Sequence, residues 1–570
     1  MTRLVPNPCD WLSCVLVMLL LAVSIPSVAA DGVIDVSLRP IPFAGVDGRI
    51  TEIQVLVRMP VDTQAAGAPL MRIPLVVSNV KTSADSLRDL KVHDSQGELA
   101  VNRRDDPATS ESYYRHWVAS RAVKGPVIAI YRIPITNAPN PLGAAPPFEL
   151  RSDGAVFSGL LGTFLLLPDS THPYRLSLQW DLKGLGAGTI GVSTLGVDDQ
   201  VSALPQPPSK LESIFAMGGR ISREPEQPAA DGFFSVWQGY PPFDARALMQ
   251  WTHRMYQYDL TFFKAPKTTY SVFLRSNPIN PGGGVEVQHS FVGTFGPDTS
   301  PEDFKLTLAH EMVHTFVGAL DDKDELAASW FSEGLAVYYQ RLLPWRAGLI
   351  SRKTYLQDIN LTAARYYTDK LNTTPNTDIA KRFWADTRVR VLPYDRGALY
   401  FTQLNAEIQA ASHGRRSLDD LLLAFLSRRN RDLDVTNSDW VAAVVKEIGP
   451  RGKQQFEDMM RGKLIVLASD TFGPCFRRVS VSMRRYDLGF TPDVLIESKR
   501  IVRGLIPGSN AAEAGLRNGD QIIEPVPQDA IQADQNALLH LTIRRSGQVM
   551  HFQYLPRGAS VPTWQWVQTR

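Results

Sequence analysis

Hydrophobic and polar residues alternate in short segments through the first third of the sequence. Residues 53–59, 127–133 and 174–180 show this alternation, and turn-rich stretches such as 137–147 separate the segments. A period of two is typical of β-strands, because successive side chains of a strand point to opposite faces of its sheet. No helical period is sustained here. Residues 31–205 are therefore predicted to form a β-sandwich domain.

The pattern changes after a proline-rich stretch at residues 204–208, LPQPP, which is typical of a linker. Two strand-like stretches, 269–274 and 285–292, lie on either side of a glycine run, and helical periods then dominate to about residue 465. We therefore predict an α+β domain over residues 210–465, with its strands first.

Two helices of this domain have recognisable ends. Ser300 followed by Pro301 predicts a helix start, since serine caps free N–H groups and proline is tolerated at the first helical position. This helix is predicted to run to about residue 316, with Gly318 near its end. A second helix is predicted over residues 332–343, ending before Pro344, because the residue before a proline disfavours helical geometry.

Residues 478–557 return to short strands around a glycine-rich segment at 504–519, which predicts a third domain. At the N-terminus, an apolar run at residues 14–25 is followed by small residues at 27–30. This layout predicts a secretory signal peptide over residues 1–30. The run is shorter than the roughly 20 apolar residues of a membrane span. An uncleaved membrane anchor is the alternative, and no other stretch has the length to cross a membrane.

Composition and cysteine content refine this picture. The chain is 44% hydrophobic and 21% charged, as in globular proteins, and its net charge of +2 includes no Lys/Arg block that would indicate nucleic acid as a partner. Cys9 and Cys14 lie in the predicted signal peptide, so only Cys475 remains and no internal disulfide can form. Export without disulfides favours a bacterial periplasmic or secreted location.

The main chemical motif is HEMVH at residues 310–314, in the first predicted helix. Residues four apart lie on one face of a helix, so the imidazoles of His310 and His314 can bind one Zn²⁺ ion. Glu311 follows the first histidine and can turn toward a water on the metal. The alternative is a buried helix with two hydrogen-bonded histidines.

Glu333 lies 18 residues after His314 in the sequence. Two histidines and one glutamate leave a fourth coordination position open, which is the arrangement of a catalytic zinc. In this interpretation zinc activates water and Glu311 takes the proton from it, so the predicted reaction is peptide hydrolysis. The alternative makes Glu333 a solvated acid that the helix dipole stabilises in the first turn of the second helix.

The HExxH motif, its spacing to Glu333 and the segment WFSEGLAVYY resemble the gluzincin peptidases. The resemblance is strongest to the glycyl aminopeptidase family of PDZ-containing zinc metallopeptidases. It implies an N-terminal β-domain, a thermolysin-like catalytic domain and a PDZ domain at residues 478–557. The implied activity is the removal of N-terminal residues with small side chains, such as Gly or Ala, from peptide substrates.

The resemblance also implies an oxyanion donor. Tyr394, in the segment YDRGAL, fits the family's tyrosine, which precedes a glycine by three residues with a basic residue between. A phenol at this place would donate to the developing oxyanion. Tyr366 and Tyr367 compete for the role but lack the following Arg-Gly.

A substrate-binding strand follows from the same resemblance. Gly283, Gly284 and Glu286 fit the family's Gly-Gly-x-Glu stretch, whose backbone pairs with the substrate and whose glutamate meets the free N-terminal amine. Glycines permit such a close backbone approach. The alternative is an ordinary loop before a strand.

In the third domain, Leu488, Gly489 and Phe490 resemble the PDZ loop that binds a peptide's C-terminal carboxylate through backbone N–H groups. Asp487 stands where that loop usually begins with glycine, which weakens the expected binding. The alternative is a purely structural domain packed on the catalytic one.

Two departures from the family bear on function. Val337 stands where relatives carry a carboxylate that orients a zinc-binding histidine, so Asp321, Asp322 or a backbone carbonyl would have to replace it. The acidic stretch at residues 321–325 replaces a basic one, which leaves room for a different substrate preference. Two alternatives to an aminopeptidase follow: an endopeptidase whose substrates are held by the PDZ domain, and a binding protein with a decayed catalytic site.

Overall fold

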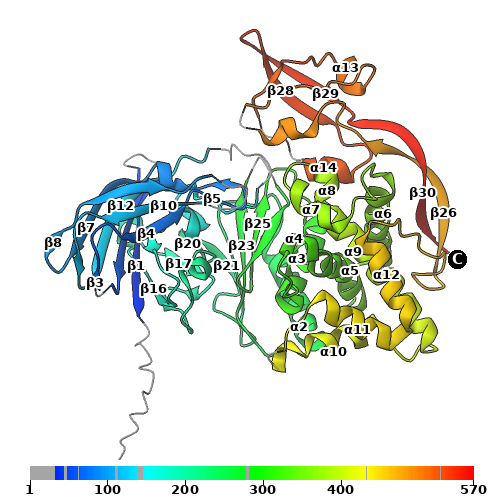
Figure 1. Cartoon of the computed structure of the whole chain (residues 1–570), viewed down its shortest axis with the longest axis horizontal. Helices are drawn as coiled ribbons and strands as arrows, with labels where there is room; N and C mark the ends of the chain where they lie inside the picture. Colours follow the sequence, from blue (N-terminus) through cyan, green and yellow to red (C-terminus); the bar gives the residue numbers. More distant parts are fainter. Residues whose placement is uncertain are drawn as a thin grey trace, which may run out of the picture.

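The computed structural model describes residues 32–569 apart from 44–47, 62, 109–112, 139–144, 278–280, 432, 498, 525 and 527. The predicted signal peptide lies outside these residues. Figure 1 shows a β-rich part on one side, a group of helices on the other, and a smaller strand-containing part above the helices. The chain is therefore multidomain, with a β-rich N-terminal region and a helical C-terminal part.

The N-terminal region contains two packed sheets. Residues Ile53, Val55 and Val57 are fully buried and alternate with more exposed positions along one strand, as the two-residue period predicts. The seven-stranded sheet runs in the order β19 (Gln200–Val201), β16 (Arg175–Trp180), β1 (Val33–Pro42), β2 (Ile50–Met59), β12 (Val127–Pro134), β7 (Arg88–Asp94), β8 (Gly97–Glu98). The four-stranded sheet runs β15 (Leu167–Pro168), β4 (Pro69–Pro74), β10 (Tyr114–Ala119), β9 (Val101–Asp105). Strands β2, β12 and β16 confirm the three predicted strands.

A third sheet joins this region to the part of the chain that contains most of the helices. Its strand β20 follows the predicted linker, so the proline-rich stretch does not separate one sheet from the next. Arg275, which is fully buried, reaches across to Glu149 with a 2.5 Å ion pair. The order of the third sheet is β13 (Arg151–Asp153), β14 (Val156–Leu160), β20 (Phe215–Gly219), β17 (Ile190–Ser193), β18 (Gly196–Val197).

A further five-stranded sheet packs against the third one through a shared apolar cluster that includes Phe215, Met217 and Phe273. Its order is β21 (Ser222–Glu224), β22 (Phe233–Trp237), β23 (Tyr270–Ser276), β25 (Ser290–Phe295), β24 (Gly284–Val287), so β24 is an edge strand.

The single strand predicted at residues 285–292 is wrong, because the structure has a hairpin of β24 and β25 there. Gln288 and His289 form its turn with φ values of 35° and 57°. Positive φ at both central residues is typical of the two-residue hairpin turns whose twist matches that of the strands. Such turns usually contain glycine or asparagine, and neither residue is present, so the turn had no sequence signal.

Helices make up most of the chain between these sheets and the C-terminal part. Helix α3 (Pro301–Val317) begins as predicted, since the Ser300 hydroxyl accepts the Asp303 N–H and Gly318 follows the helix end. The other helices are α1 (Pro208–Leu211), α2 (Ala245–Phe262), α4 (Glu325–Ala328), α5 (Trp330–Arg346), α6 (Arg352–Thr368), α7 (Asn376–Arg382), α8 (Thr387–Arg390), α9 (Leu392–Ala411), α10 (Leu418–Leu426), α11 (Asn437–Ile448) and α12 (Pro450–Met460).

Helix α5 continues past Pro344, where an end was predicted. Proline removes only its own N–H donor. Helical hydrogen bonds continue beyond it, since the Ala347 N–H donates to the Leu343 carbonyl at 2.9 Å. Most of the α5 side chains are buried. Packing on both sides of the helix therefore outweighs the local preference of the residue before a proline.

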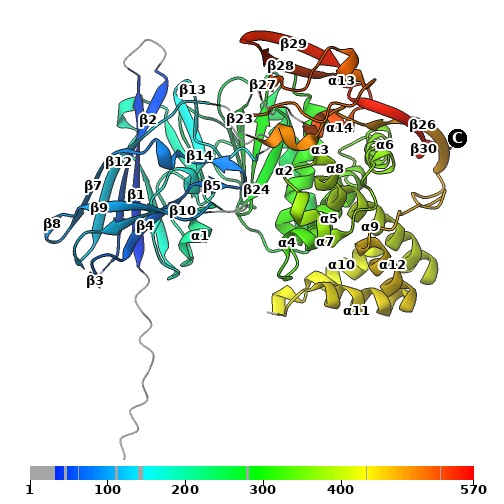
Figure 2. The same ribbon diagram turned by 45° about the horizontal axis from the view of Figure 1, so that its top comes forward.

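The C-terminal part has two pieces, a small core and a long ribbon. The small core lies around a sheet of β27 (Gln521–Ile522), β28 (Leu539–Arg545) and β29 (Gln548–Tyr554), beside the short helices α13 (Asn510–Glu513) and α14 (Gln528–Ala533). The ribbon pairs β26 (Phe476–Tyr486) with β30 (Arg557–Gln568) and curves over α6 (Figures 1 and 2). The Asn360 side chain bonds both the N–H and the carbonyl of buried Trp566, at 2.7 and 2.8 Å.

Candidate metal centre

Three predicted ligands converge on one point. The Nε2 atoms of His310 and His314 are 3.2 Å apart, and each lies 3.3 Å from Oε2 of Glu333. In a regular tetrahedron with bonds of about 2.0–2.1 Å, the zinc–ligand length, neighbouring ligand atoms are about 3.3–3.4 Å apart. The three atoms are thus spaced as three ligands on one face of a zinc tetrahedron would be. Within the described residues they are the one group of His, Cys, Asp and Glu side chains that could hold a metal.

Two helices set this triangle. Helix α3 places His310 and His314 one turn apart on one face, and α5, packed against α3, presents Glu333 from its first turn. Glu311 lies between the two histidines in sequence and is half-buried. Burial raises the pKa of Glu311, the two imidazoles lower it, and the carboxylates of Glu333 and Glu286 raise it again. A raised pKa suits a group that must take up a proton and release it.

A close contact between helices brings Tyr394 to the metal centre. A Cβ atom on Gly334 would lie 2.6 Å from Cα of Gly397, and one on Gly397 would lie 2.4 Å from the Trp330 carbonyl oxygen. Only glycines allow α5 and α9 to approach this closely. Tyr394 lies one turn before Gly397, and its ring stacks on the imidazole of His310 with centroids 5.8 Å apart.

The neighbouring residues of the YDRG segment fix its position. Both carboxylate oxygens of buried Asp395 accept bonds from Arg365, at 2.6 and 2.7 Å. Buried Arg396 donates to the side chain of Asn376 at 2.6 Å. The competing tyrosines lie elsewhere, since the Tyr366 hydroxyl accepts the Ile465 N–H and the Tyr367 ring packs against Trp564 of the ribbon.

The predicted substrate strand is β24, the edge strand beside α3. Gly284 has no room for a side chain, because a Cβ atom there would lie 2.1 Å from the Phe291 ring. The Gly283 carbonyl accepts the Thr294 N–H at 2.8 Å. Glu286 accepts the His289 N–H at 3.2 Å, and its charge acts on both Glu311 and His314. The structure therefore brings the Gly-Gly-x-Glu segment to the metal centre, with one strand edge unpaired.

Gln340 orients His310, a role that the sequence did not indicate. Its Oε1 lies 2.9 Å from Nδ1 of His310, and its Nε2 donates to Asp358 at 3.0 Å. A carboxylate only accepts, so the amide nitrogen must face Asp358 and the amide oxygen must accept from the Nδ1–H of His310. That tautomer leaves Nε2 of His310 free to bind metal. Arg341 holds Asp358 in place at 2.9 Å.

Asp321 and Asp322, two of the replacements proposed for the missing carboxylate, form bonds elsewhere. Asp321 and Asp322 accept the backbone N–H groups of Val435 and Asn437, each at 2.8 Å, and so hold the start of α11. Val337 is buried. Gln340 lies seven residues after Glu333, which is two helical turns and the same face of α5. That spacing is the signal by which it could have been found.

Replacing Gln340 by leucine is expected to weaken zinc binding about 10–100-fold, the usual loss when the hydrogen-bond partner of a metal-binding histidine is removed. The side chain is similar in size, but His310 loses the acceptor that fixes its tautomer. Zinc affinity measured by competition with a chromophoric chelator checks this. Gln454→Leu, an exposed position on α12, is the control. If Gln340→Leu and the wild type bound zinc with equal affinity, Gln340 would have no role in orienting His310.

The predicted carboxylate-binding loop lies away from the metal centre. The carboxylate of Asp487 accepts the Gly489 N–H at 3.0 Å and pairs with Lys370 of the helical part. Leu488 and Phe490 are buried. A short 3₁₀ helix (Pro492–Ile496) follows the loop directly. One donor of the loop is therefore already occupied by the protein's own carboxylate.

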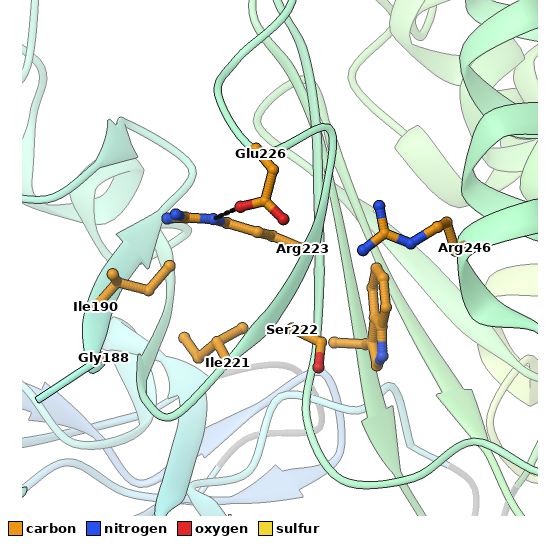
Figure 3. Close-up of a pocket in the computed structure, with 8 residues that line it drawn as sticks. Gly188, Ile190, Ile221, Ser222, Arg223, Glu226 and Arg246 are labelled. Atoms are coloured by element: carbon orange, nitrogen blue, oxygen red, sulfur yellow. Dashed lines mark hydrogen bonds and ion pairs between the residues drawn. The ribbon is translucent and has the colours of Figure 1, made fainter.

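A separate pocket of about 350 Å³ lies between the third sheet and α2 (Figure 3). Its two arginines are neutralised, since Arg223 bonds Glu226 at 3.0 Å and Arg246 pairs with Glu224. No metal-centre residue lines this pocket.

One family model and several solved structures are similar to this chain. Residues 304–389 match the family model described as M61 glycyl aminopeptidase, and this segment contains His310, His314 and Glu333. An aminopeptidase N family protein from Idiomarina loihiensis has a similar fold, with a TM-score of 0.64 and 14% identity over 94% of this chain and 98% of that one.

An M1 zinc metallopeptidase from Deinococcus radiodurans aligns with a TM-score of 0.45 and 16% identity over 77% of this chain and 95% of that one. No curated protein sequence matches the chain. The three candidate ligands thus lie in the segment that matches the peptidase M61 model, in a chain whose fold is similar to that of an aminopeptidase N family protein.

Proposed function

We propose that this protein is a zinc-dependent aminopeptidase that removes N-terminal residues from peptides. The observation that carries the proposal is the triangle of His310, His314 and Glu333 ligand atoms at zinc spacing, with Glu311 beside it. When bound, zinc would supply Lewis acidity that polarises the scissile carbonyl and makes a water nucleophilic at neutral pH.

The side chains around the triangle have complementary roles. Glu311 takes a proton from the attacking water and passes it to the nitrogen of the leaving amine. The Tyr394 hydroxyl, beside His310, donates a hydrogen bond to the carbonyl oxygen as negative charge grows on it. Gln340 keeps His310 in its metal-binding tautomer.

Restriction to the N-terminus is proposed to come from Glu286 and β24. A peptide would add to the unpaired edge of β24 through backbone hydrogen bonds. Its free ammonium group would then pair with the carboxylate of Glu286. We propose small N-terminal residues such as Gly or Ala as the preferred substrates.

Hydrolysis of glycine and alanine p-nitroanilides, free and N-acetylated, tests the proposal. The free compounds should be hydrolysed and the acetylated ones should not, since Glu286 needs a free ammonium group. 1,10-Phenanthroline should abolish the activity and added Zn²⁺ should restore it. Equal cleavage of acetylated peptides would support the endopeptidase alternative. Protein that is purified without zinc and hydrolyses nothing would support the binding-protein alternative.

We propose a PDZ-like, structural role for residues 478–557. The supporting observation is Asp487, which fills part of the carboxylate loop and pairs with Lys370. A peptide with a free C-terminal carboxylate should therefore bind more tightly to Asp487→Gly than to the wild type in a fluorescence anisotropy titration. Tight binding to the wild type would favour a substrate-holding domain instead.

Export to the periplasm or medium is also part of the proposal, on the basis of the predicted signal peptide. N-terminal sequencing of the protein from the periplasmic fraction should begin near residue 31, whereas a chain starting at residue 1 would contradict it. Among the described residues, no helix has both the length and the apolar character needed to cross a membrane.

A further inference from the structure

The turn of the β24–β25 hairpin is tied to the N-terminal region of the chain. Strand β24, which carries Glu286, lies where the helical part borders the β-rich part (Figure 2). The turn consists of two residues, Gln288 and His289. The side-chain amide of Gln288 donates to the backbone carbonyl of Lys210 at 2.6 Å, and Lys210 lies 78 residues earlier, in α1. The hairpin therefore has an attachment outside its own sheet.

Helix α1 is itself held firmly by the N-terminal sheets. Leu211 is fully buried in the apolar core of those sheets. The Glu212 carbonyl accepts the Gly162 N–H at 2.9 Å, and the Glu212 carboxylate accepts the Tyr114 hydroxyl of β10 at 3.2 Å. These contacts on both sides of its chain make the Lys210 carbonyl a fixed acceptor for the hairpin.

The backbone of the turn needs such an attachment. Gln288 and His289 have φ values of 35° and 57°, in the left-handed region that residues other than glycine and asparagine rarely adopt. A strained conformation of this kind persists only where surrounding contacts hold it. The bond from Gln288 to the Lys210 carbonyl is one of those contacts.

The same turn orients Glu286. Its Oε1 accepts the N–H of His289 at 3.2 Å, so the carboxylate is fastened to the residue next to Gln288. The open end of the hairpin is held separately, since the Thr294 N–H donates to the Gly283 carbonyl at 2.8 Å. The direction of the Glu286 carboxylate therefore depends on the closed end of the hairpin, where Gln288 meets α1.

We propose that Gln288 is a positioning residue for substrate recognition, which holds the hairpin turn against α1 and so places the Glu286 carboxylate where the ammonium group of a peptide binds. The inference rests on the proposed aminopeptidase function, in which Glu286 binds that group. It gives the N-terminal region a part in recognising the free end of the substrate, because the acceptor of the Gln288 amide is the Lys210 carbonyl.

Gln288→Asn tests the attachment without disturbing the turn. Asparagine tolerates a left-handed backbone better than glutamine, but its side chain is one methylene shorter and leaves the Lys210 carbonyl out of hydrogen-bond range. KM for alanine p-nitroanilide should rise about two- to tenfold, the usual worth of one hydrogen bond. The value of kcat, the zinc content and the midpoint of thermal unfolding should stay at those of the wild type. If Gln288 served only to form the turn, KM would not change.

Ser546→Asn is the matched control. Ser546 is the first residue of the two-residue turn between β28 and β29, is exposed, and has a φ of 49°. Asparagine is therefore introduced into the same kind of turn in the C-terminal part of the chain, and KM should be that of the wild type.

A double-mutant cycle with Glu286→Gln shows whether Gln288 acts through Glu286. The glutamine keeps an acceptor for the His289 N–H but removes the charge, so it should raise KM by itself. Gln288→Asn should then add nothing in the Glu286→Gln background, because no carboxylate is left to position. Independent, multiplied increases in KM would overturn the inference, as would an unchanged KM for Gln288→Asn alone. A wild type that hydrolyses no alanine p-nitroanilide would instead overturn the proposed function, and the inference with it.

Discussion

Replacing Glu311 by glutamine is expected to lower kcat by about 10²–10⁴-fold, the usual contribution of a general base, while zinc stays bound. Glutamine has nearly the same shape but cannot take a proton from water. The three metal-binding side chains are unchanged, so the zinc content by inductively coupled plasma mass spectrometry should equal that of the wild type. Hydrolysis of alanine p-nitroanilide measures kcat.

Glu302→Gln provides the matched control. Glu302 is an exposed residue of the same helix that pairs with Lys305, and its loss should leave kcat and zinc content unchanged. If Glu311→Gln kept wild-type turnover, another group would have to accept the proton. Lost zinc in the variant would instead make Glu311 a part of the metal-binding structure.

Gly397→Ala is expected to damage both stability and the active centre. The new Cβ atom would lie 2.4 Å from the Trp330 carbonyl oxygen, so α5 and α9 must separate. Overpacking of this kind costs about 1–3 kcal/mol. The shift also moves Tyr394 and Glu333, which these helices carry. We expect a lower midpoint of thermal unfolding together with a loss of kcat.

Two further variants separate the effects of that substitution. Gly184→Ala has no neighbouring atom within 4 Å of its new Cβ and should change neither unfolding nor activity. Tyr394→Phe removes only the hydroxyl and should lower kcat with unchanged unfolding and unchanged zinc content. An unaltered unfolding midpoint for Gly397→Ala would mean that the two helices tolerate separation.

Local chemistry explains which parts of the centre were predictable from sequence. The start of α3 depends on Ser300 and Pro301 alone, and the pairing of His310 with His314 depends only on helical spacing. Glu333 required a helix packing that the sequence does not display, and its prediction rested on the interval after His314. The contact between α5 and α9 that positions Tyr394 was not predictable either. The sequence shows only that a glycine, Gly397, follows Tyr394 by three residues.

Features that depend on distant partners were missed or wrongly predicted. The interval of seven residues from Glu333 places Gln340 on the ligand face of α5, but it does not show that Asp358 of α6 turns the Gln340 amide oxygen toward His310. The hairpin at Gln288 uses a left-handed backbone without glycine. Helix α5 passes Pro344 because buried side chains on both sides hold it. In each case tertiary contacts outweighed a local preference.

The ribbon also has a consequence for how this protein can be divided. Trp566 is 1% exposed and belongs to the same apolar core as the helices that carry the metal ligands. It is held there by Asn360, 206 residues earlier in the chain. A fragment that stopped after α12 would keep the three metal-binding residues. It would lack Trp566, so the part of the core that this side chain fills would be exposed. We therefore expect a piece of this chain to reach full stability only when it includes β26 and β30.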